Sequence, residues 1–207
     1  MYKILYMKKT PYSTLPPFIL ASSSPRRREL LTTLGLAFEV IPPQVEELEV
    51  HGETPREHVA RLSRAKAFEV AKREVDRWIL GADTVVFIDG TILGKPKDEA
   101  EAYSMLKKIS GREHKVITGF FIYHPYHSTS FGDEIESFVK VKALDEKEIK
   151  GYIKTEEPFD KAGAYAIQGI GMFMIEKVRG SYTNVIGLPV CEIIAALKQV
   201  GAIRLFE

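Results

Sequence analysis

Short apolar runs alternate along this chain with longer segments whose apolar residues recur every three or four positions. The first pattern is typical of buried strands, and the second is typical of helices that bury one face. Strands are predicted at residues 18–21, 37–41, 79–88, 91–93, 115–123, 135–142 and 172–177. The chain is therefore predicted to be an α/β protein.

The expected helices begin with recognisable capping residues. A Ser, Thr or Asp side chain at a helix start accepts a hydrogen bond from a first-turn amide, and a glutamate three residues later reinforces the cap. Such signals, or a proline that starts a helix, occur at Ser24, Thr54, Asp98, Asp145 and Pro189. Five helices are therefore predicted, and the last one ends before Gly201.

An Asp-Gly pair at 89–90 separates two of the predicted strands and is typical of a two-residue hairpin. Because the other strands are joined by helices, the sheet is expected to be mixed. Residues 1–17 are interpreted as an N-terminal extension before the first strand. Residues 18–207 are interpreted as a single domain.

Composition narrows the classes of function. The 207 residues carry 29 basic and 28 acidic side chains and no long block of one charge, so any anion site must be local and no nucleic-acid partner is expected. No apolar run approaches the roughly 20 residues of a membrane span, and the N-terminus lacks secretion-signal features. We expect a cytoplasmic protein without a membrane partner. Its one cysteine, Cys191, is expected to be a core residue.

The segment FILASSSPRRREL, residues 18–30, places three arginines where a strand is followed by a helix. A helix turns about 100° per residue, which projects Arg27 from the middle of the apolar face and Arg26 from its flank. An inward charge is costly unless it meets a partner, here either a buried carboxylate or a bound anion. An anion would also meet the first-turn amides and the hydroxyls of Ser22 and Ser24, which suits a phosphate.

Asp83 and Thr84 interrupt the apolar run at 79–88. A buried carboxylate must be paired, bound to a metal or altered in its protonation. Counting back from the hairpin turn pairs Thr84 with Lys95 and brings Lys95 close to Asp83. Strict alternation places Asp83 on the opposite face of the hairpin from Lys95, so the side chains of Asp83 and Lys95 meet only if a glycine bends the hairpin. A structural Asp83–Lys95 ion pair is the alternative to a ligand site.

A third inward charge is Lys66, which lies among apolar positions of the helix after Thr54 and points to the core side or extends to solvent. Upstream of that helix, Glu46 and Glu47 are either solvated or part of a metal site. A set of basic residues that binds a polyphosphate needs a divalent metal cation beside it. Since carboxylates suit Mg²⁺ or Mn²⁺, Glu47 and Asp83 are candidate ligands.

Two segments rich in glycine and polar residues, 157–169 and 180–189, lie near predicted strand ends. Such segments close over ligands or fill cores. The side-chain amide of Gln168 matches the N3–H and a neighbouring carbonyl of uracil or thymine. Guanine presents two donors on that edge and would require a glutamate.

Taken together, ASSSPRRREL, the glutamate pair, RLSRAKA, GADTVV, GKP, EPFDKAGAYAIQG and GSYTNVIGLP resemble the Maf (septum-formation-inhibitor-like) nucleoside triphosphate pyrophosphatases. The similarity extends from about Phe18 to the last helix. It implies a two-lobed mixed sheet with flanking helices, similar to the inosine triphosphate pyrophosphatases, with the active-site cleft between the lobes. It also implies metal-dependent hydrolysis of nucleoside triphosphates to monophosphates and pyrophosphate, and relatives suggest a homodimer.

The resemblance also implies roles for individual residues. Asp83 corresponds to the catalytic proton acceptor. The residues linked to substrate choice are Arg26, Thr84 and Gln168. The phosphate- and metal-binding set comprises Ser22, Ser24, Arg27, Glu47, Lys66 and Lys95.

The AIQG form resembles the branch that acts on dTTP and UTP, whereas the 7-methyl-GTP branch usually carries glutamate at the position of Gln168. The expected function is therefore house-cleaning hydrolysis of dTTP, UTP or modified pyrimidine nucleotides. The alternatives are a 7-methyl-GTP pyrophosphatase and a nucleotide-binding regulator of septum formation with little catalysis. The regulator needs the phosphate site but not Asp83, so the set of Asp83, Lys95 and Glu47 favours the enzyme.

Overall fold

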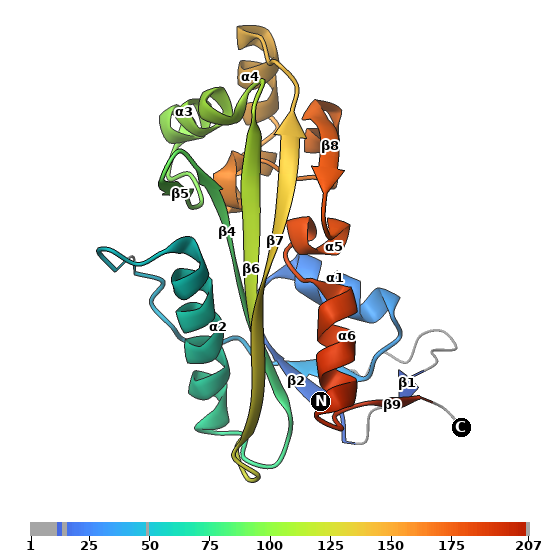
Figure 1. Ribbon diagram of the computed structural model, residues 1–207. Helices are drawn as coiled ribbons and strands as arrows, with labels where there is room; N and C mark the ends of the chain where they lie inside the picture. The colour runs from blue at the N-terminus through green and yellow to red at the C-terminus, as the bar shows by residue number, and fades with distance from the viewer. Residues whose placement is uncertain (1–11, 14–15, 49, 206–207) are drawn as a thin grey trace. The chain divides into compact units, whose positions relative to one another are not determined.

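The computed structural model describes residues 12–13, 16–48 and 50–205. Within these residues the chain forms a mixed seven-stranded sheet and a separate two-stranded sheet, together with helices (Figure 1). The larger sheet has the strand order β3-β2-β4-β6-β7-β8, and β5 pairs with β4. The predicted mixed α/β class is confirmed.

The predicted strands and helices follow one another in the expected order, and the structure adds β1, β9, α5 and the short 3₁₀ helices. The strands are β1 (Tyr12–Ser13), β2 (Phe18–Ala21), β3 (Phe38–Val40), β4 (Ile79–Ile88), β5 (Thr91–Leu93), β6 (Glu113–His124), β7 (Thr129–Val141), β8 (Ile175–Arg179) and β9 (Arg204–Leu205). The helices are α1 (Pro25–Thr33), α2 (Pro55–Ala71), α3 (Glu99–Ile109), α4 (Glu146–Ile153), α5 (Tyr182–Ile186) and α6 (Val190–Gln199). The short 3₁₀ helices are η1 (Glu157–Asp160), η2 (Ala162–Ala164) and η3 (Ile170–Met174).

The predicted capping residues begin their helices. Ser24, Thr54, Asp98 and Asp145 each accept a hydrogen bond from the backbone amide three residues later. Thr54 and Asp145 form complete capping boxes, because the glutamate at the third helical position also accepts from the cap backbone. These local contacts fix where the charged helices α1 and α2 begin.

The chain divides into two compact units, and the first comprises residues 1–83, 119–134 and 187–207. Its strand β2 is buried at every position and pairs in parallel with β3 and β4. Helix α2 lies close to the sheet, because a Cβ added at Gly81 would sit 2.2 Å from the carbonyl oxygen of Ser63, and one at Gly119 would sit 2.6 Å from backbone atoms of Val59. Glycine therefore sets the spacing between α2 and the sheet.

The second unit comprises residues 84–118 and 135–186. Its core is built from β4, α3, α4 and the segments around them, and α3 packs against α4 and η2 (Figure 1). The β4–β5 hairpin has the predicted register, with Val86 opposite Leu93 and Ile88 opposite Thr91. Asp89 and Gly90 both adopt positive φ angles, as a tight two-residue turn requires.

Three predictions about local structure are wrong. The ladder ends at Val86–Leu93 because β5 stops at Leu93, so the expected Thr84–Lys95 strand pair does not form. The strand expected at 172–177 begins at Ile175, since residues 170–174 form the 3₁₀ helix η3. Cys191 is exposed because it lies on the solvent side of α6, whose buried residues begin at Ile193.

Strand β1, within the predicted N-terminal extension, pairs antiparallel with β9 near the other end of the chain. Residues 1–11 and 14–15 of the extension lie outside the described residues. Within the residues that the structure describes, no helix is long and apolar enough to cross a membrane.

Candidate functional site

The centre of the candidate site is Lys66, which extends from α2 and is buried. Its Nζ lies 2.6 Å from Oδ1 of Asp83 on β4 and 2.5 Å from Oε1 of Glu47 in the β3–α2 loop. The Asp83 side chain is 7% exposed, whereas that of Glu47 is 50% exposed. One ammonium thus joins a buried carboxylate to a carboxylate that solvent and ligands can reach.

Arg27 lies on the buried face of α1, as the helix geometry predicted. Its Nε donates to the carbonyl oxygen of Gly187 at 2.8 Å, and its Nη1 donates to that of Ala82 at 2.7 Å and to Ser22 Oγ at 3.3 Å. Burial lowers the pKa of Arg27, while the negative charges of Asp83 and Glu47 act in the opposite direction. The guanidinium is therefore fixed by neutral acceptors and electrostatically coupled to the two carboxylates.

The serines before α1 shape the start of this helix. Ser24 is the N-cap, with its Oγ accepting from the Arg27 amide, and the Ser24 amide donates to Ser22 Oγ at 3.2 Å. The first turn contains no acidic residue. Arg26 is half-buried on the flank of the helix, as predicted. The helix start therefore keeps the positive end of its dipole uncompensated by acidic residues, which favours an anion.

The first unit thus brings together most of the predicted site residues: Ser22, Ser24, Arg26, Arg27, Glu47, Lys66 and Asp83. Asp83 is paired with Lys66, a helix residue, rather than reached through the hairpin pairing that the sequence suggested. The Lys66 side chain of α2 reaches Asp83 because Gly81, two residues earlier on β4, lets the helix approach the strand closely.

The remaining predicted residues, Thr84, Lys95 and Gln168, belong to the second unit. Thr84 is half-buried, and its Oγ1 lies 2.9 Å from Oγ1 of Thr118, which donates to the carbonyl oxygen of Asn184. Lys95 is exposed two residues beyond the end of β5, and Gln168 is half-buried just before η3.

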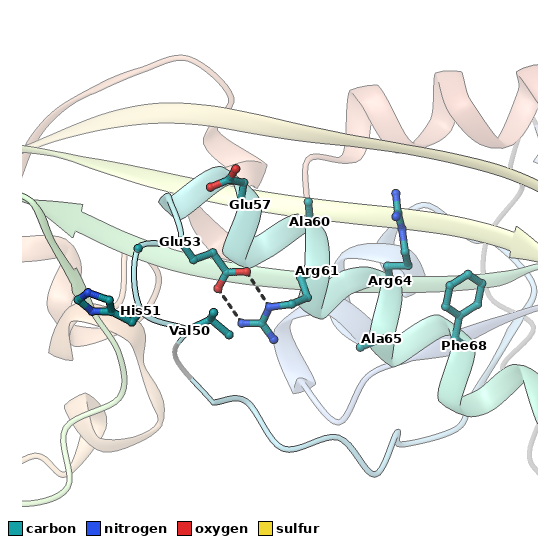
Figure 2. Close-up of a pocket in the computed structure, with 10 residues that line it drawn as sticks. Val50, His51, Glu53, Glu57, Ala60, Arg61, Arg64, Ala65 and Phe68 are labelled. Carbon is teal, nitrogen blue, oxygen red and sulfur yellow. Dashed lines mark hydrogen bonds and ion pairs between the residues drawn. The ribbon is translucent and has the colours of Figure 1, made fainter.

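The sequence did not predict the hydrogen bonds between α2 and the loop that contains Glu47. Arg61 on α2 forms two hydrogen bonds with Glu53, from Nε at 2.6 Å and from Nη2 at 2.7 Å, as Figure 2 shows. His58 contacts the same carboxylate, and Arg61 Nη2 also donates to the carbonyl oxygen of Leu48 at 3.0 Å. The Arg61 guanidinium lowers the pKa of Glu53 by hydrogen bonding to its charged form. Glu47 therefore sits directly beside a residue tied to the helix that carries Lys66.

No group of three or more His, Cys, Asp or Glu residues that could hold a metal occurs among the residues that the structure describes. The pair of Glu47 and Asp83 nevertheless fits a hard divalent cation, because both carboxylates already converge on a single positive charge, the Lys66 ammonium. Mg²⁺ is commonly held by one or two carboxylates together with substrate phosphates. The donor set therefore suits an ion that arrives with a polyphosphate.

Comparison with known proteins identifies relatives over nearly the whole chain. The family described as Maf-like protein matches residues 17–200. A dTTP/UTP pyrophosphatase of Geotalea uraniireducens is 51% identical over 186 residues, covering 90% of this chain and 96% of that protein. Proteins with the same name are 51% identical in Syntrophotalea carbinolica, covering 91% of this chain and 86% of the relative, and 46% identical in Clostridioides difficile, covering 91% and 97%.

Proposed function

This chain belongs to the Maf-like protein family, and we propose that it is a nucleoside triphosphate pyrophosphatase that hydrolyses dTTP and UTP to the monophosphate and pyrophosphate. The observation that carries the proposal is the cluster in which buried Lys66 bridges buried Asp83 and exposed Glu47. Relatives about half identical to this chain are dTTP/UTP pyrophosphatases, which supports the same substrates here.

The basic residues and serines would bind the triphosphate. Arg26, Arg27, Lys66 and Lys95 supply positive charge, and Ser22 and Ser24 supply hydroxyl groups near the start of α1. Arg27 is suited to this role because its guanidinium is already oriented by hydrogen bonds to Ala82 and Gly187. Little reorganisation is then needed when the phosphates bind.

Glu47 and Asp83 would hold a divalent cation, Mg²⁺ or Mn²⁺, which would supply positive charge to the phosphate oxygens. Asp83 orients the attacking water and accepts its proton as the water oxygen forms a bond to the α-phosphorus. The bond from the α-phosphorus to the bridging oxygen breaks, and pyrophosphate leaves with the bonding electron pair. Lys66 lies within 2.6 Å of this carboxylate and keeps it oriented before the substrate arrives.

Base choice is proposed to rest on Arg26, Thr84 and Gln168. The Gln168 amide offers one acceptor and two donors, which match the N3–H and a carbonyl oxygen of thymine or uracil. The half-buried position of Gln168 leaves it accessible to a base. Exchanging Gln168 for glutamate should therefore weaken use of dTTP relative to guanine nucleotides.

The first experiment is product analysis with purified protein, Mg²⁺ or Mn²⁺, and a panel of dTTP, UTP, CTP, GTP and 7-methyl-GTP. Monophosphate and pyrophosphate are followed separately, and a chelator tests the need for the cation. Formation of both products mainly from dTTP and UTP supports the proposal. The Asp83→Asn variant should lose turnover while retaining much of the nucleotide binding, and near-wild-type turnover would remove Asp83 from this role.

The other outcomes identify the alternatives. Turnover of 7-methyl-GTP in place of dTTP and UTP would retain the reaction and discard the base assignment. Binding of nucleotides without turnover would favour a regulatory protein. The proposal also includes a house-cleaning role in the cytoplasm. It includes a homodimer as well, and light scattering on the purified protein measures this oligomeric state.

A further inference from the structure

The backbone on both sides of Gln168 is held by two side chains, Tyr152 from α4 and Glu157 from η1. Oε1 of Glu157 accepts a hydrogen bond from the Ile170 amide at 3.0 Å, and Oε2 accepts one from the Gly171 amide at 2.8 Å. The Tyr152 hydroxyl donates to the same Oε2 at 2.8 Å and accepts from the Ala166 amide at 3.2 Å. Three backbone amides flanking Gln168 are thus bound to one tyrosine–glutamate pair.

Two glycines allow this pair to approach the loop closely. Gly169 has φ 83° and ψ −151°, a conformation that is nearly restricted to glycine. A Cβ there would lie 2.1 Å from Oε1 of Glu157, and a Cβ at Gly171 would lie 2.7 Å from the Tyr152 hydroxyl. A side chain at either position would therefore clash with the Tyr152–Glu157 pair, so glycine is required for this close approach.

Tyr152 connects this arrangement to the interior of the second unit. Its side chain is buried in the main hydrophobic cluster of that unit, its ring packs against Phe173 of η3, and its hydroxyl reaches the loop. Burial and the neighbouring Glu157 carboxylate raise the pKa of Tyr152, so the phenol stays protonated and remains a donor. The loop position is thereby set by the packed core.

We propose that Tyr152 and Glu157 are positioning residues that set the pyrimidine preference of this protein by holding Gln168 in register with the base. The inference rests on the proposed hydrolysis of dTTP and UTP. It assigns a role to two residues whose hydrogen bonds go to each other and to the loop backbone. Within the described residues the Gln168 amide itself makes no hydrogen bond, so the backbone on either side carries its orientation.

The physical reason is the directionality of base recognition. An amide that faces N3–H and a carbonyl must present its oxygen and its NH₂ group in the correct order, and polar groups left unpaired against the base lower discrimination strongly. Displacement of the loop by about 1 Å is enough to misalign such a pair. Most of the residues proposed to bind the triphosphate, namely Ser22, Ser24, Arg26, Arg27 and Lys66, belong to the first unit, whereas this loop belongs to the second.

The test is Glu157→Gln, with Glu156→Gln as the control because Glu156 is an exposed neighbour that loses the same charge. An amide at position 157 would place an NH₂ group against a backbone N–H or the Tyr152 hydroxyl. We expect kcat/KM for dTTP to fall about tenfold, mainly through KM, while that for GTP changes less than about twofold. Glu156→Gln should leave both values at the wild-type level.

A double-mutant cycle separates positioning from general structure. In a Gln168→Ala background, Glu157→Gln should no longer reduce kcat/KM for dTTP, because the amide it positions is gone. If the two effects instead multiply, or if dTTP and GTP are affected equally, the inference is wrong. Thermal melts are used to check that each variant is folded. Should Glu157→Gln fail to fold, Tyr152→Phe replaces it in the cycle, with an expected loss of about threefold for dTTP.

The wild-type measurement distinguishes this inference from the proposed function. If wild-type protein hydrolyses neither dTTP nor UTP, the proposed function fails and the inference falls with it. If wild-type protein prefers dTTP and UTP but the cycle shows no coupling, only the positioning role is overturned.

Discussion

Replacing His114 by glutamine should make the stability of this protein less sensitive to acid. His114 is 2% exposed, and its Nε2 lies 2.7 Å from the hydroxyl of Tyr165. Its Nδ1 has no hydrogen-bond partner among the described residues. An imidazolium at this position would therefore be buried with a single neutral partner, and burial lowers the pKa of His114 from 6.5 to about 4.

The sign and size of the effect follow from proton linkage. Between pH 6.5 and pH 4 the unfolded chain binds a proton at His114 and the folded chain does not, so the unfolded state gains stability as the pH falls. The contribution of neutral His114 to the free energy of unfolding has its full value above pH 6.5 and decreases as the pH falls below this value. For these two pKa values, the free energy of unfolding falls by about 2 kcal/mol between pH 7 and pH 5.

Urea unfolding at pH 7 and pH 5 measures this difference. Far-UV circular dichroism is the suitable probe, because the single tryptophan, Trp78, lies in the first unit and His114 lies in the second. His114→Gln retains a polar group for Tyr165 but cannot titrate, so it should lose about 2 kcal/mol less than the wild type over this range. His51→Gln, at an exposed histidine, should behave as the wild type. Equal losses in wild type and His114→Gln, within about 0.5 kcal/mol, would refute the argument.

Three further predictions concern stability and are checked by urea or thermal unfolding. Lys66→Met removes the ion-pair partner of buried Asp83 and should lower the free energy of unfolding by about 3 kcal/mol. Lys66→Arg keeps the charge and should lower the free energy of unfolding less. Equal losses in the two variants would contradict the ion-pair argument. Gly81→Ala places a Cβ 2.2 Å from the Ser63 carbonyl oxygen and should cost about 3 kcal/mol, so an unchanged midpoint would mean that α2 approaches β4 less closely. Thr54→Ala breaks a capping box and should cost about 1 kcal/mol, with Thr54→Ser retaining most of it.

The elements that sequence reasoning located well are those with local signals. The caps at Ser24 and Asp98 depend on contacts within four residues, and the β4–β5 register depends on one Asp-Gly turn. The burial of Arg27 and Lys66 also follows from local geometry, because a helix fixes which residues share a face. Such features need no knowledge of the rest of the chain.

The features that escaped prediction arise from contacts between distant segments. The sequence suggested Lys95 as the neighbour of Asp83 because the hairpin is local, yet Asp83 is paired with Lys66 from α2. That pairing depends on how closely α2 packs against β4. Gly81 allows this close packing, and the hydrophobic pattern of the sequence does not predict it. Likewise, the strand expected at 172–177 begins only at Ile175, because residues 170–174 form a 3₁₀ helix whose Ile170 and Gly171 amides donate to Glu157.

Under the proposed function, the arrangement around Lys66 would allow one site to bind both a cation and a triphosphate. The Lys66 ammonium lies between Glu47 and Asp83 and neutralises two carboxylates that would otherwise repel each other. Under the proposed function, Glu47 and Asp83 would hold a divalent cation that supplies this positive charge, and the Lys66 ammonium would then be available to phosphate oxygens. Glu47 is exposed and could rearrange for this role, whereas Asp83 is buried on β4. Under the proposed function, the positive charge that binds phosphate is already present in the folded protein, and substrate binding would redistribute it.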